Sequence, residues 1–122
     1  LGTDQFPAFW SRTSGLKAPL RLDDAAAIAA FIRAREALAL GGGVLVANPV
    51  PAGDEIPADE IGTHIEAAYA DSLAAGITGT AGTPFPLDAI LRRTGGRSLA
   101  TNIALIRNNA RVAAEIATAL AG

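Results

Sequence analysis

Apolar residues recur at helical spacing in four stretches of this 122-residue chain. Side chains at positions i, i+3, i+4 and i+7 lie on one side of an α-helix, so each stretch is predicted to form a helix with one buried face. The helices are expected within residues 21–40, 57–76 and 83–96, and from Ser98 almost to Gly122. Asp23 or Asp24 would cap the first helix by accepting a hydrogen bond from a free backbone N–H.

The spacing also predicts which side chains these helices bury. On the second helix the apolar stripe comprises Ile61, Ile65, Ala68, Tyr69 and Leu73. On the last helix it comprises Asn102, Leu105, Ile106, Asn109, Val112, Ala113 and Ile116. Two carboxamides therefore lie on an apolar stripe, although asparagine is a poor helix former and is costly to bury without hydrogen-bond partners.

The run VLVAN at 44–48 is short and apolar, as expected of a β-strand covered on both faces. Such a strand needs neighbours that pair with its backbone N–H and C=O groups. Further strands would lie either within 1–22 and 77–82 or in residues outside this chain, and we favour the second. The pattern indicates an α/β protein with three layers, α/β/α, of which this chain is the helix-rich end.

The first residues support the same interpretation. Leu1 and Gly2 resemble the end of a strand, and the chain contains no methionine. We therefore expect the chain to be a piece of a longer protein, which we call the full-length protein.

Composition narrows the classes of function. Half of the residues are hydrophobic, the net charge is −2 and Lys and Arg form no cluster, which argues against a nucleic-acid surface. No apolar run approaches the ~20 residues of a membrane span, and no basic start followed by an apolar run indicates a signal peptide. Cysteine is absent, which excludes disulfides and thiolate metal sites. We expect a cytoplasmic protein without membrane or nucleic-acid partners.

The two asparagines of the last stripe admit two interpretations. Most buried amides are satisfied by hydrogen bonds to neighbouring chain segments, and from the residues alone this structural role is favoured. Alternatively, one amide faces a pocket, where its adjacent acceptor and donors suit a ring with neighbouring C=O and N–H groups, such as uracil. Asn102, in the first turn of the helix, is better placed to reach a cleft than Asn109.

Three other features carry candidate chemistry. Thr3 and Asp4 follow the expected strand end, where α/β proteins bind ligands. The stretch TGGRSL at 94–99 places glycines at a helix N-terminus that could cradle a phosphate, although an ordinary turn is the favoured interpretation. Lys17, the only lysine, lies in a Gly/Pro loop and is expected to be solvated rather than nucleophilic.

The aromatic cluster Phe6, Phe9 and Trp10 is more typical of a core than of a stacking platform. His64 is the only histidine and has no second histidine at ligand spacing, so a solvated side chain is the favoured interpretation.

Several stretches, taken together and in order, resemble the C-terminal portion of the pseudouridine-5′-phosphate glycosidase family, also called the indigoidine synthase A family. The matching stretches are GTDQFPAFW-SRTSG, GGGVLVANPVP, IPADEI, GITGTAGTPF and TGGRSLATNIALIRNNARVAAEIA. The resemblance covers essentially the whole chain. It implies that residues 1–122 are the C-terminal part of a single α/β/α domain whose N-terminal part is absent, and that the full-length protein is a homotrimer.

The resemblance implies reversible cleavage of the C–C glycosidic bond of pseudouridine 5′-phosphate into uracil and ribose 5-phosphate. In this family a lysine forms an imine with the opened sugar, a carboxylate moves protons, and a divalent metal ion, usually manganese, assists. The family's lysine, acid/base glutamate, metal-binding aspartate and phosphate-binding residues all lie upstream of the matching part. We therefore expect no catalytic residue and no metal ligand in this chain, which should be inactive by itself.

Asn102, within ATNIAL, matches the family asparagine that contacts the uracil base. The resemblance therefore favours base recognition by Asn102 and a structural role for Asn109. Thr3 and Asp4 are the other expected substrate contacts. Gln5 stands where the family has an acid, so no charged role carries over to that position.

Two alternatives stay open. A relative could run the reaction towards synthesis and join ribose 5-phosphate to an aromatic acceptor. The chain could instead be a non-catalytic helical binding module, which would fold stably from these residues alone. As partners we expect a small nucleotide substrate and either assembly into a homotrimer or complementation with the N-terminal part.

Overall fold

The computed structural model describes residues 1–77 and 84–122, and these residues form four α-helices at the positions that the sequence predicts. They are α1 (Ala25–Ala37), α2 (Ala58–Ala74), α3 (Pro84–Arg93) and α4 (Arg97–Ala121), with a short 3-10 helix, η1 (Ala52–Asp54), before α2. Most of the GITGTAGTPF stretch and most of the possible strand at 77–82 lie outside the described residues. None of the described helices is long and apolar enough to cross a lipid bilayer.

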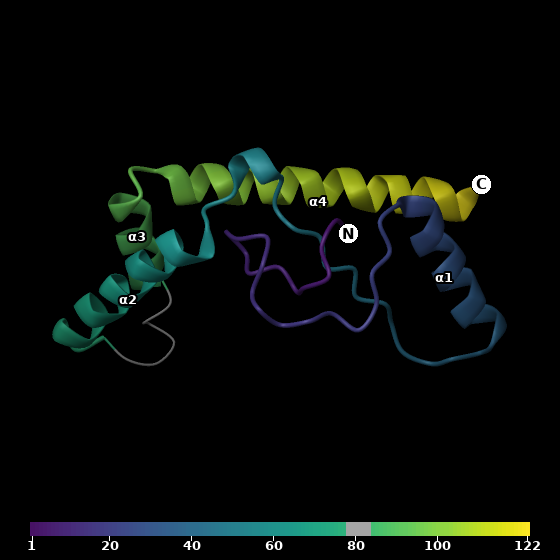
Figure 1. The fold of residues 1–122 in the computed structure, drawn as a ribbon, viewed down its shortest axis with the longest axis horizontal. Helices are drawn as coiled ribbons and strands as arrows, with labels where there is room; N and C mark the ends of the chain where they lie inside the picture. The colour runs from purple at the N-terminus through teal and green to yellow at the C-terminus, as the bar shows by residue number, and fades with distance from the viewer. Residues whose placement is uncertain (78–83) are drawn as a thin grey trace.

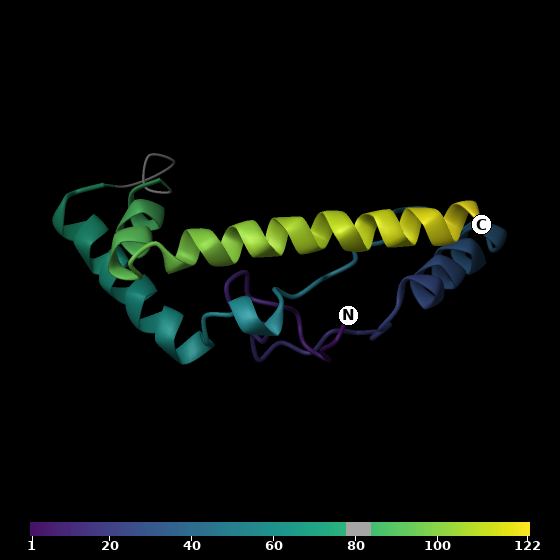
Figure 2. The ribbon, with the colours of Figure 1, turned by 90° about the horizontal axis from the view of Figure 1, so that it is seen from above.

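Helix α4 is the longest described element and runs along most of the length of the molecule, with α2 and α3 extending beyond its N-terminal end (Figure 1). Helices α2 and α3 lie together at its N-terminal end, and α1 lies at its C-terminal end. The irregular N-terminal segment lies beside the middle of α4, with η1 close to the same helix (Figure 2). The molecule is therefore elongated, and α4 joins its two ends.

Local residues explain where the helices begin and end. Asp24 caps α1, because its carboxylate accepts a hydrogen bond of 2.7 Å from the backbone N–H of Ala27. Pro57 precedes α2, where its missing N–H costs nothing. Gly76 follows α2 with a φ of 68°, a conformation that glycine adopts without the steric cost of a Cβ.

The best-packed core lies where α2 and α3 meet. Its buried apolar residues are Ile56, Ile61, Ala68, Ala89 and Ile90. Trp10 packs against this core from the N-terminal segment. The indole N–H of Trp10 donates to the carbonyl of Ser98 at 3.2 Å, and the Trp10 carbonyl accepts a hydrogen bond of 2.9 Å from the N–H of Ile56. One aromatic residue therefore joins the N-terminal segment to the core and to the start of α4.

The predicted stripe of α2 is only partly buried. Ile61 and Ala68 are buried as expected, but Ile65, Tyr69 and Leu73 are exposed. The helix packs mainly on α3, so the side that carries these three residues has no cover within the described part of the chain. Periodicity predicts which face of a helix is apolar, and it does not predict what covers that face.

On α4 the buried face is turned away from part of the predicted stripe. Its buried residues are Ser98, Thr101, Leu105 and Val112. Asn102 is half-buried at the edge of this face, and Ile106 is exposed. Thr101 is buried because its hydroxyl donates a hydrogen bond of 2.7 Å to the carbonyl of Asp54, a long-range contact that hydrophobicity does not predict.

The predicted strand at 44–48 is extended but has no β-ladder. The described residues contain only two isolated β-bridges, Gln5 with Lys17 and Ala8 with Ser11. The extended run lacks the cover that its apolar pattern predicts, since Leu45 is 86% exposed. A strand needs a neighbour to pair with, and no described segment provides one. The fold seen in this chain is therefore helical, and the sheet of an α/β/α arrangement is not present among the described residues.

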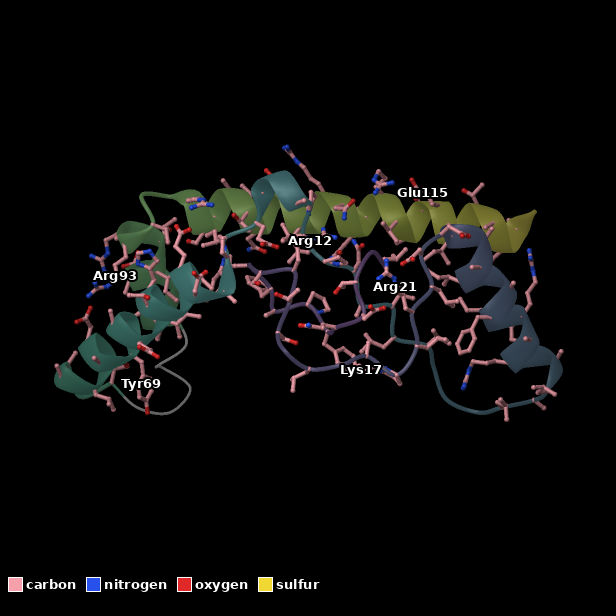
Figure 3. The ribbon with its side chains drawn as sticks, in the orientation of Figure 1. Arg12, Lys17, Arg21, Tyr69, Arg93 and Glu115 are labelled. Carbon is pink, nitrogen blue, oxygen red and sulfur yellow. The ribbon has the colours of Figure 1, made fainter. Side chains whose placement is uncertain are left out.

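Arg12 joins three segments in the middle of the molecule (Figure 3). Its guanidinium donates to the carbonyl of Val50 at 2.6 Å and to that of Gly2 at 3.5 Å. Its backbone N–H donates to the carboxylate of Glu55 at 2.9 Å. Gly2 has a φ of 67°, and a Cβ there would come within 3.2 Å of the guanidinium, so glycine suits both the backbone conformation and the close contact.

We predict that Arg12→Lys lowers the free energy of unfolding of the full-length protein by about 1–3 kcal/mol. An ammonium cannot reproduce the planar fork of the guanidinium, so an accepting carbonyl loses its charge-assisted partner. Urea denaturation followed by circular dichroism measures the change. Arg107→Lys is the matched control, because Arg107 is exposed on α4. Equal losses in the two variants would contradict the role assigned to Arg12.

Candidate functional site

In the described part of the chain, three cavities lie next to residues that the sequence singles out. One, of about 480 Å³, is lined by Asn48 and Asn109 together with apolar residues of the 44–46 run and of α4. The other two contain the predicted substrate contacts Thr3 and Asn102.

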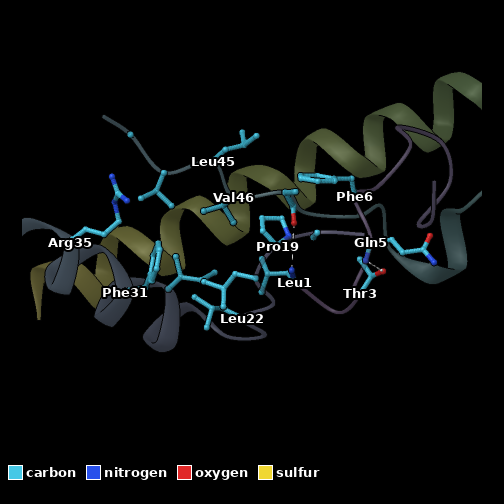
Figure 4. A pocket seen from close by; sticks show the side chains of 16 residues that line it. Leu1, Thr3, Gln5, Phe6, Pro19, Leu22, Phe31, Arg35, Leu45 and Val46 are labelled. Atoms are coloured by element: carbon cyan, nitrogen blue, oxygen red, sulfur yellow. Dashed lines mark hydrogen bonds between the residues drawn. The ribbon is translucent and has the colours of Figure 1, made fainter. Parts of the chain in front are cut away.

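The cavity that contains Thr3, of about 310 Å³, lies between the N-terminal segment, α1 and residues 43–47. Its walls are mostly apolar, with Phe31 towards one end and Thr3 towards the other (Figure 4). The second, also of about 310 Å³, contains Asn102. We call them the amino-terminal cavity and the Asn102 cavity.

Thr3 and Asp4 are adjacent in sequence but have different surroundings. Thr3 lines the amino-terminal cavity, and its hydroxyl accepts a hydrogen bond of 3.1 Å from the N–H of Gln5. Asp4 lies at the surface, where its carboxylate pairs with the guanidinium of Arg21 at 3.2 Å and its side chain is 71% exposed. Asp4 therefore already has a cationic partner within the chain.

Arg21 also holds Asp23, which is not the cap of α1. Hydrogen bonds of 2.9 Å from Arg21 and from the backbone N–H of Gly2 keep the pKa of the Asp23 carboxyl below its ordinary value. Hydrogen bonds to Asp23 and Asp4 in turn raise the pKa of Arg21. The stability that Asp23 contributes is present above its ordinary pKa and is lost as the pH falls through the lowered one. At neutral pH the pair ties the start of the chain to the residues before α1.

Gln5 has a structural role. Its side-chain carbonyl accepts a hydrogen bond of 2.7 Å from the N–H of Gly15, and Gln5 and Lys17 form a bridge that closes the loop between them. The side chain of Lys17 is exposed, as the sequence predicts (Figure 3). An exposed amine lacks the desolvation that activates a nucleophilic lysine.

The Asn102 cavity brings aromatic, aliphatic and amide groups together from three parts of the chain. It is lined by Phe9 and Trp10 of the N-terminal segment, Leu87, Asp88 and Leu91 of α3, and Ser98, Leu99 and Asn102 of α4. Asn102 is half-buried, and no group of the described residues hydrogen-bonds its carboxamide. No polar side-chain atom there is buried without a partner, so the amide is open to the cavity rather than sealed off. The carboxamide is available to a ligand.

The neighbouring asparagines are engaged within the chain. Asn109 accepts a hydrogen bond of 2.9 Å from the side chain of Asn48. Asn108 donates to the carbonyl of Pro49 at 3.4 Å and accepts from Arg111 at 2.8 Å. These contacts fasten the extended run to α4, which confirms the structural interpretation of Asn109. Asn108, which the pattern did not single out, has the same role.

The turn before α4 offers no open anion site. Gly96 precedes the helix with a φ of 86°, and the N–H of Ser98 donates to the hydroxyl of Thr94 at 3.1 Å. The guanidinium of Arg97 pairs with the carboxylate of Glu60 at 2.7 Å. A backbone donor and the charge that a phosphate would use are already occupied, which supports the ordinary-turn interpretation.

Phe9 does not lie in the core, contrary to the prediction. The residue is 49% exposed, and its backbone has a φ of 62°. It occupies the first corner of a two-residue turn in which Ala8 and Ser11 exchange backbone hydrogen bonds of 2.9 and 3.3 Å. A positive φ at that corner suits glycine, and for another residue it costs roughly 1–3 kcal/mol. No periodic pattern marks this turn, so the sequence did not reveal Phe9 as a cavity residue.

The three predicted substrate contacts lie in three different places. Asn102 lines the Asn102 cavity with Phe9 and Trp10. Thr3 lines the amino-terminal cavity instead, and Asp4 lies at the surface beside Arg21. Within this chain the predicted contacts do not form a single site.

Comparison with known proteins places the chain among a defined set of relatives. The sequence model of the family described as indigoidine synthase A like protein matches residues 1–119. The pseudouridine-5′-phosphate glycosidase of Methylobacterium nodulans is 65% identical over 98% of this chain and 36% of its own length. That of Solibacter usitatus is 58% identical over 98% of this chain and 40% of its own length. The chain thus spans about two fifths of the length of the curated relatives it matches.

Two solved structures share the backbone arrangement. The prealnumycin C-glycosynthase AlnA, in complex with ribulose 5-phosphate, is 30% identical and superposes with a TM-score of 0.86 over 97% of this chain and 39% of its own. An indigoidine synthase A-like protein from Thermotoga maritima is 35% identical, with a TM-score of 0.76 over 94% of this chain and 37% of its own. This chain therefore has the backbone arrangement of a part of each larger protein.

We predict that Asn48→Ala and Asn109→Ala each lower the free energy of unfolding of the full-length protein by about 1 kcal/mol, and that the double variant loses little more. Both changes remove the same hydrogen bond, so their effects should not add. Chemical denaturation of the four proteins measures the coupling. Asn102→Ala is the control for stability, because it breaks no described hydrogen bond. Additive losses would show that the Asn48–Asn109 bond is not the stabilising contact.

Proposed function

This chain belongs to the family of indigoidine synthase A like proteins, and on that premise we propose that the full-length protein is a pseudouridine-5′-phosphate glycosidase. It cleaves the C–C glycosidic bond of pseudouridine 5′-phosphate reversibly to uracil and ribose 5-phosphate. The identity of 65% and 58% to relatives with this name supports the assignment. This chain supplies one wall of the pocket for the base.

The unpaired carboxamide of Asn102 is the observation that carries the role of this chain. Uracil has C=O and N–H groups side by side, and a carboxamide can donate to the first and accept from the second. Asn108 and Asn109 on the same helix have partners within the chain, whereas Asn102 opens into a cavity with aromatic walls. Among the described asparagines of α4, Asn102 is the one whose carboxamide makes no hydrogen bond within the described part of the chain.

The bond to be broken explains why a lysine is needed. A C–C glycosidic bond has no leaving-group oxygen to protonate, so the two-carboxylate route of O-glycosidases does not apply. In the synthetic direction, the imine formed by a lysine and the opened sugar accepts the electron pair of the uracil carbon. In cleavage, the electron pair of the C–C bond returns to uracil, which takes up a proton. Water then hydrolyses the imine and releases ribose 5-phosphate from the lysine. Lys17 is exposed, so the reacting lysine belongs to the rest of the full-length protein.

A divalent metal ion, manganese, is proposed to assist this reaction. Within the described residues no three His, Cys, Asp or Glu side chains lie close enough together to hold a metal ion. The described part of this chain therefore does not fit such a site by itself, and the ligands are proposed to lie in the N-terminal part.

We further propose that residues 1–122 are the C-terminal part of one three-layer α/β/α domain that the N-terminal part completes. The extended apolar run at 44–48 has no pairing partner among the described residues, which supports this arrangement. The exposed apolar side of α2, with Ile65, Tyr69 and Leu73, also needs cover. The N-terminal part and, in a homotrimer, neighbouring copies would provide that cover.

Other predicted features fit this proposal. Thr3 and Asp4 would contact the sugar phosphate only where the N-terminal part brings it to the N-terminal loop. The cytoplasmic location stays a prediction. The exposed apolar surfaces argue against a helical binding module that folds from these residues alone.

The likeness to AlnA favours a second candidate, a C-glycosynthase that joins ribose 5-phosphate to an aromatic acceptor. The backbones superpose with a TM-score of 0.86, but the sequence identity is 30%, against 65% to the glycosidase of Methylobacterium nodulans. Comparing uracil with bulkier aromatic acceptors in the synthetic direction separates the two. Cleavage of pseudouridine 5′-phosphate is the better supported candidate.

We predict that Asn102→Ala in the full-length protein lowers kcat/KM for uracil release. The loss of transition-state stabilisation should be about 1–3 kcal/mol, because a polar group of the base loses its partner. The rate is followed by chromatography of the released uracil. Asn109→Ala makes the same chemical change on the same helix and should keep kcat/KM near the wild-type value. Unchanged kcat/KM in Asn102→Ala would remove the base-recognition role.

We also predict that the 122-residue chain, purified by itself, releases no uracil. Its only lysine is exposed, and the reacting lysine is expected in the missing part. Addition of the separately purified N-terminal part should restore activity if the two parts complement each other. Uracil release by the isolated chain would contradict this division of roles.

A further inference from the structure

Phe9 forms a wall of the Asn102 cavity while much of its ring stays open. The ring of Trp10 lies perpendicular to the Phe9 ring, with the centroids 4.9 Å apart. Trp10 is itself held by the carbonyl of Ser98 and by the core of α2 and α3. The Phe9 ring therefore rests on a fixed neighbour and does not depend on its own burial for its position.

Phe9 combines a strained backbone conformation with incomplete burial. A φ of 62° at the first corner of a tight turn favours glycine, and phenylalanine is strained there. A core side chain would offset that strain by leaving water, but Phe9 is 49% exposed. Strained backbone positions gather at ligand-binding sites, where the strain is retained for function. The backbone strain at Phe9 is therefore not offset by full burial of its side chain.

We propose that Phe9 is a substrate-binding residue on which the planar base stacks, while Asn102 pairs with the polar edge of the same base. The inference deepens the proposed function and rests on it. An aromatic face attracts any planar ring, so Phe9 supplies affinity with little selectivity. The carboxamide distinguishes one ring edge from another. A cavity of about 310 Å³ is large enough for one such ring.

The test uses the full-length protein with Phe9→Leu, Phe9→Tyr, Phe9→Gly and Asn102→Ala. Uracil binding is measured by calorimetry, uracil release from pseudouridine 5′-phosphate by chromatography, and stability by the thermal midpoint. Leucine keeps the strain and an apolar side chain but removes the aromatic face. We expect Phe9→Leu to weaken uracil binding roughly 5- to 150-fold, and Phe9→Tyr to retain it.

Phe9→Gly separates binding from folding. Glycine relieves the strain of the turn, so the thermal midpoint should stay the same or rise while uracil binding falls as in Phe9→Leu. Tyr69→Leu is the matched control, because it removes an exposed aromatic ring on α2, outside the Asn102 cavity. It should bind uracil like the wild type.

The probe 3-methyluracil distinguishes the two residues. It keeps the aromatic face but lacks the N–H beside the carbonyls, so Phe9→Leu should weaken the binding of uracil and 3-methyluracil by the same factor. Asn102→Ala should instead narrow the difference in binding affinity between uracil and 3-methyluracil.

Each outcome decides for or against the proposal. If Phe9→Leu and Phe9→Gly bind uracil as tightly as the wild type, the inference is overturned. If Asn102→Ala still impairs uracil binding and release in that case, the proposed function stands. A fall in the thermal midpoint of Phe9→Gly that accompanies its loss of binding assigns Phe9 to folding and also overturns the inference. If the wild type binds uracil through Phe9 but releases none from the nucleotide, the proposed function fails and the stacking role stands. If the wild type neither binds nor releases uracil, both fail.

Discussion

The short segment from Trp10 to Arg12, which leaves the turn formed by Phe9 and Trp10, connects the parts of this molecule that no helix packing brings together. Trp10 hydrogen-bonds the start of α4 and covers the core of α2 and α3, while Arg12 binds the carbonyls of Gly2 and Val50. Helix α4 offers only one narrow apolar face, so it cannot position these irregular segments alone. Phe9 directly precedes Trp10, and its place beside Asn102 therefore follows from the same turn.

The packing of this chain is incomplete by the standards of a self-contained domain. The apolar side of α2 and the extended run at 44–48 are left open, with Leu45 86% exposed. The matching part belongs to longer relatives, since the chain covers only 36% and 40% of the length of two of them. A segment whose hydrophobic groups remain in water needs a partner. The same logic applies to the proposed reaction, because the chain carries the amide that we propose to recognise the base, and its one lysine is exposed.

Part of the candidate site could be derived from the sequence. A carboxamide on an apolar stripe pointed to Asn102, and the structure shows that carboxamide unpaired in a cavity. Phe9 could not be derived in this way. Its exposure depends on a positive φ in a two-residue turn, which leaves no periodic trace, and on Trp10 filling the neighbouring core position. The roles of Asn108 and Asn109 could be distinguished from that of Asn102 only from their hydrogen-bond partners, which lie about sixty residues earlier in the chain.

The sequence by itself determined the number and positions of the helices, because caps such as Asp24, breakers such as Gly76 and 3.6-residue periodicity act between near neighbours. Its motifs also determined the family, since they occur in order over the whole chain. Only the tertiary structure decided that Tyr69 is exposed, that Thr101 is buried and that Phe9 lines the same cavity as Asn102. These outcomes depend on which distant segments meet, and contacts between distant segments are not encoded in local spacing.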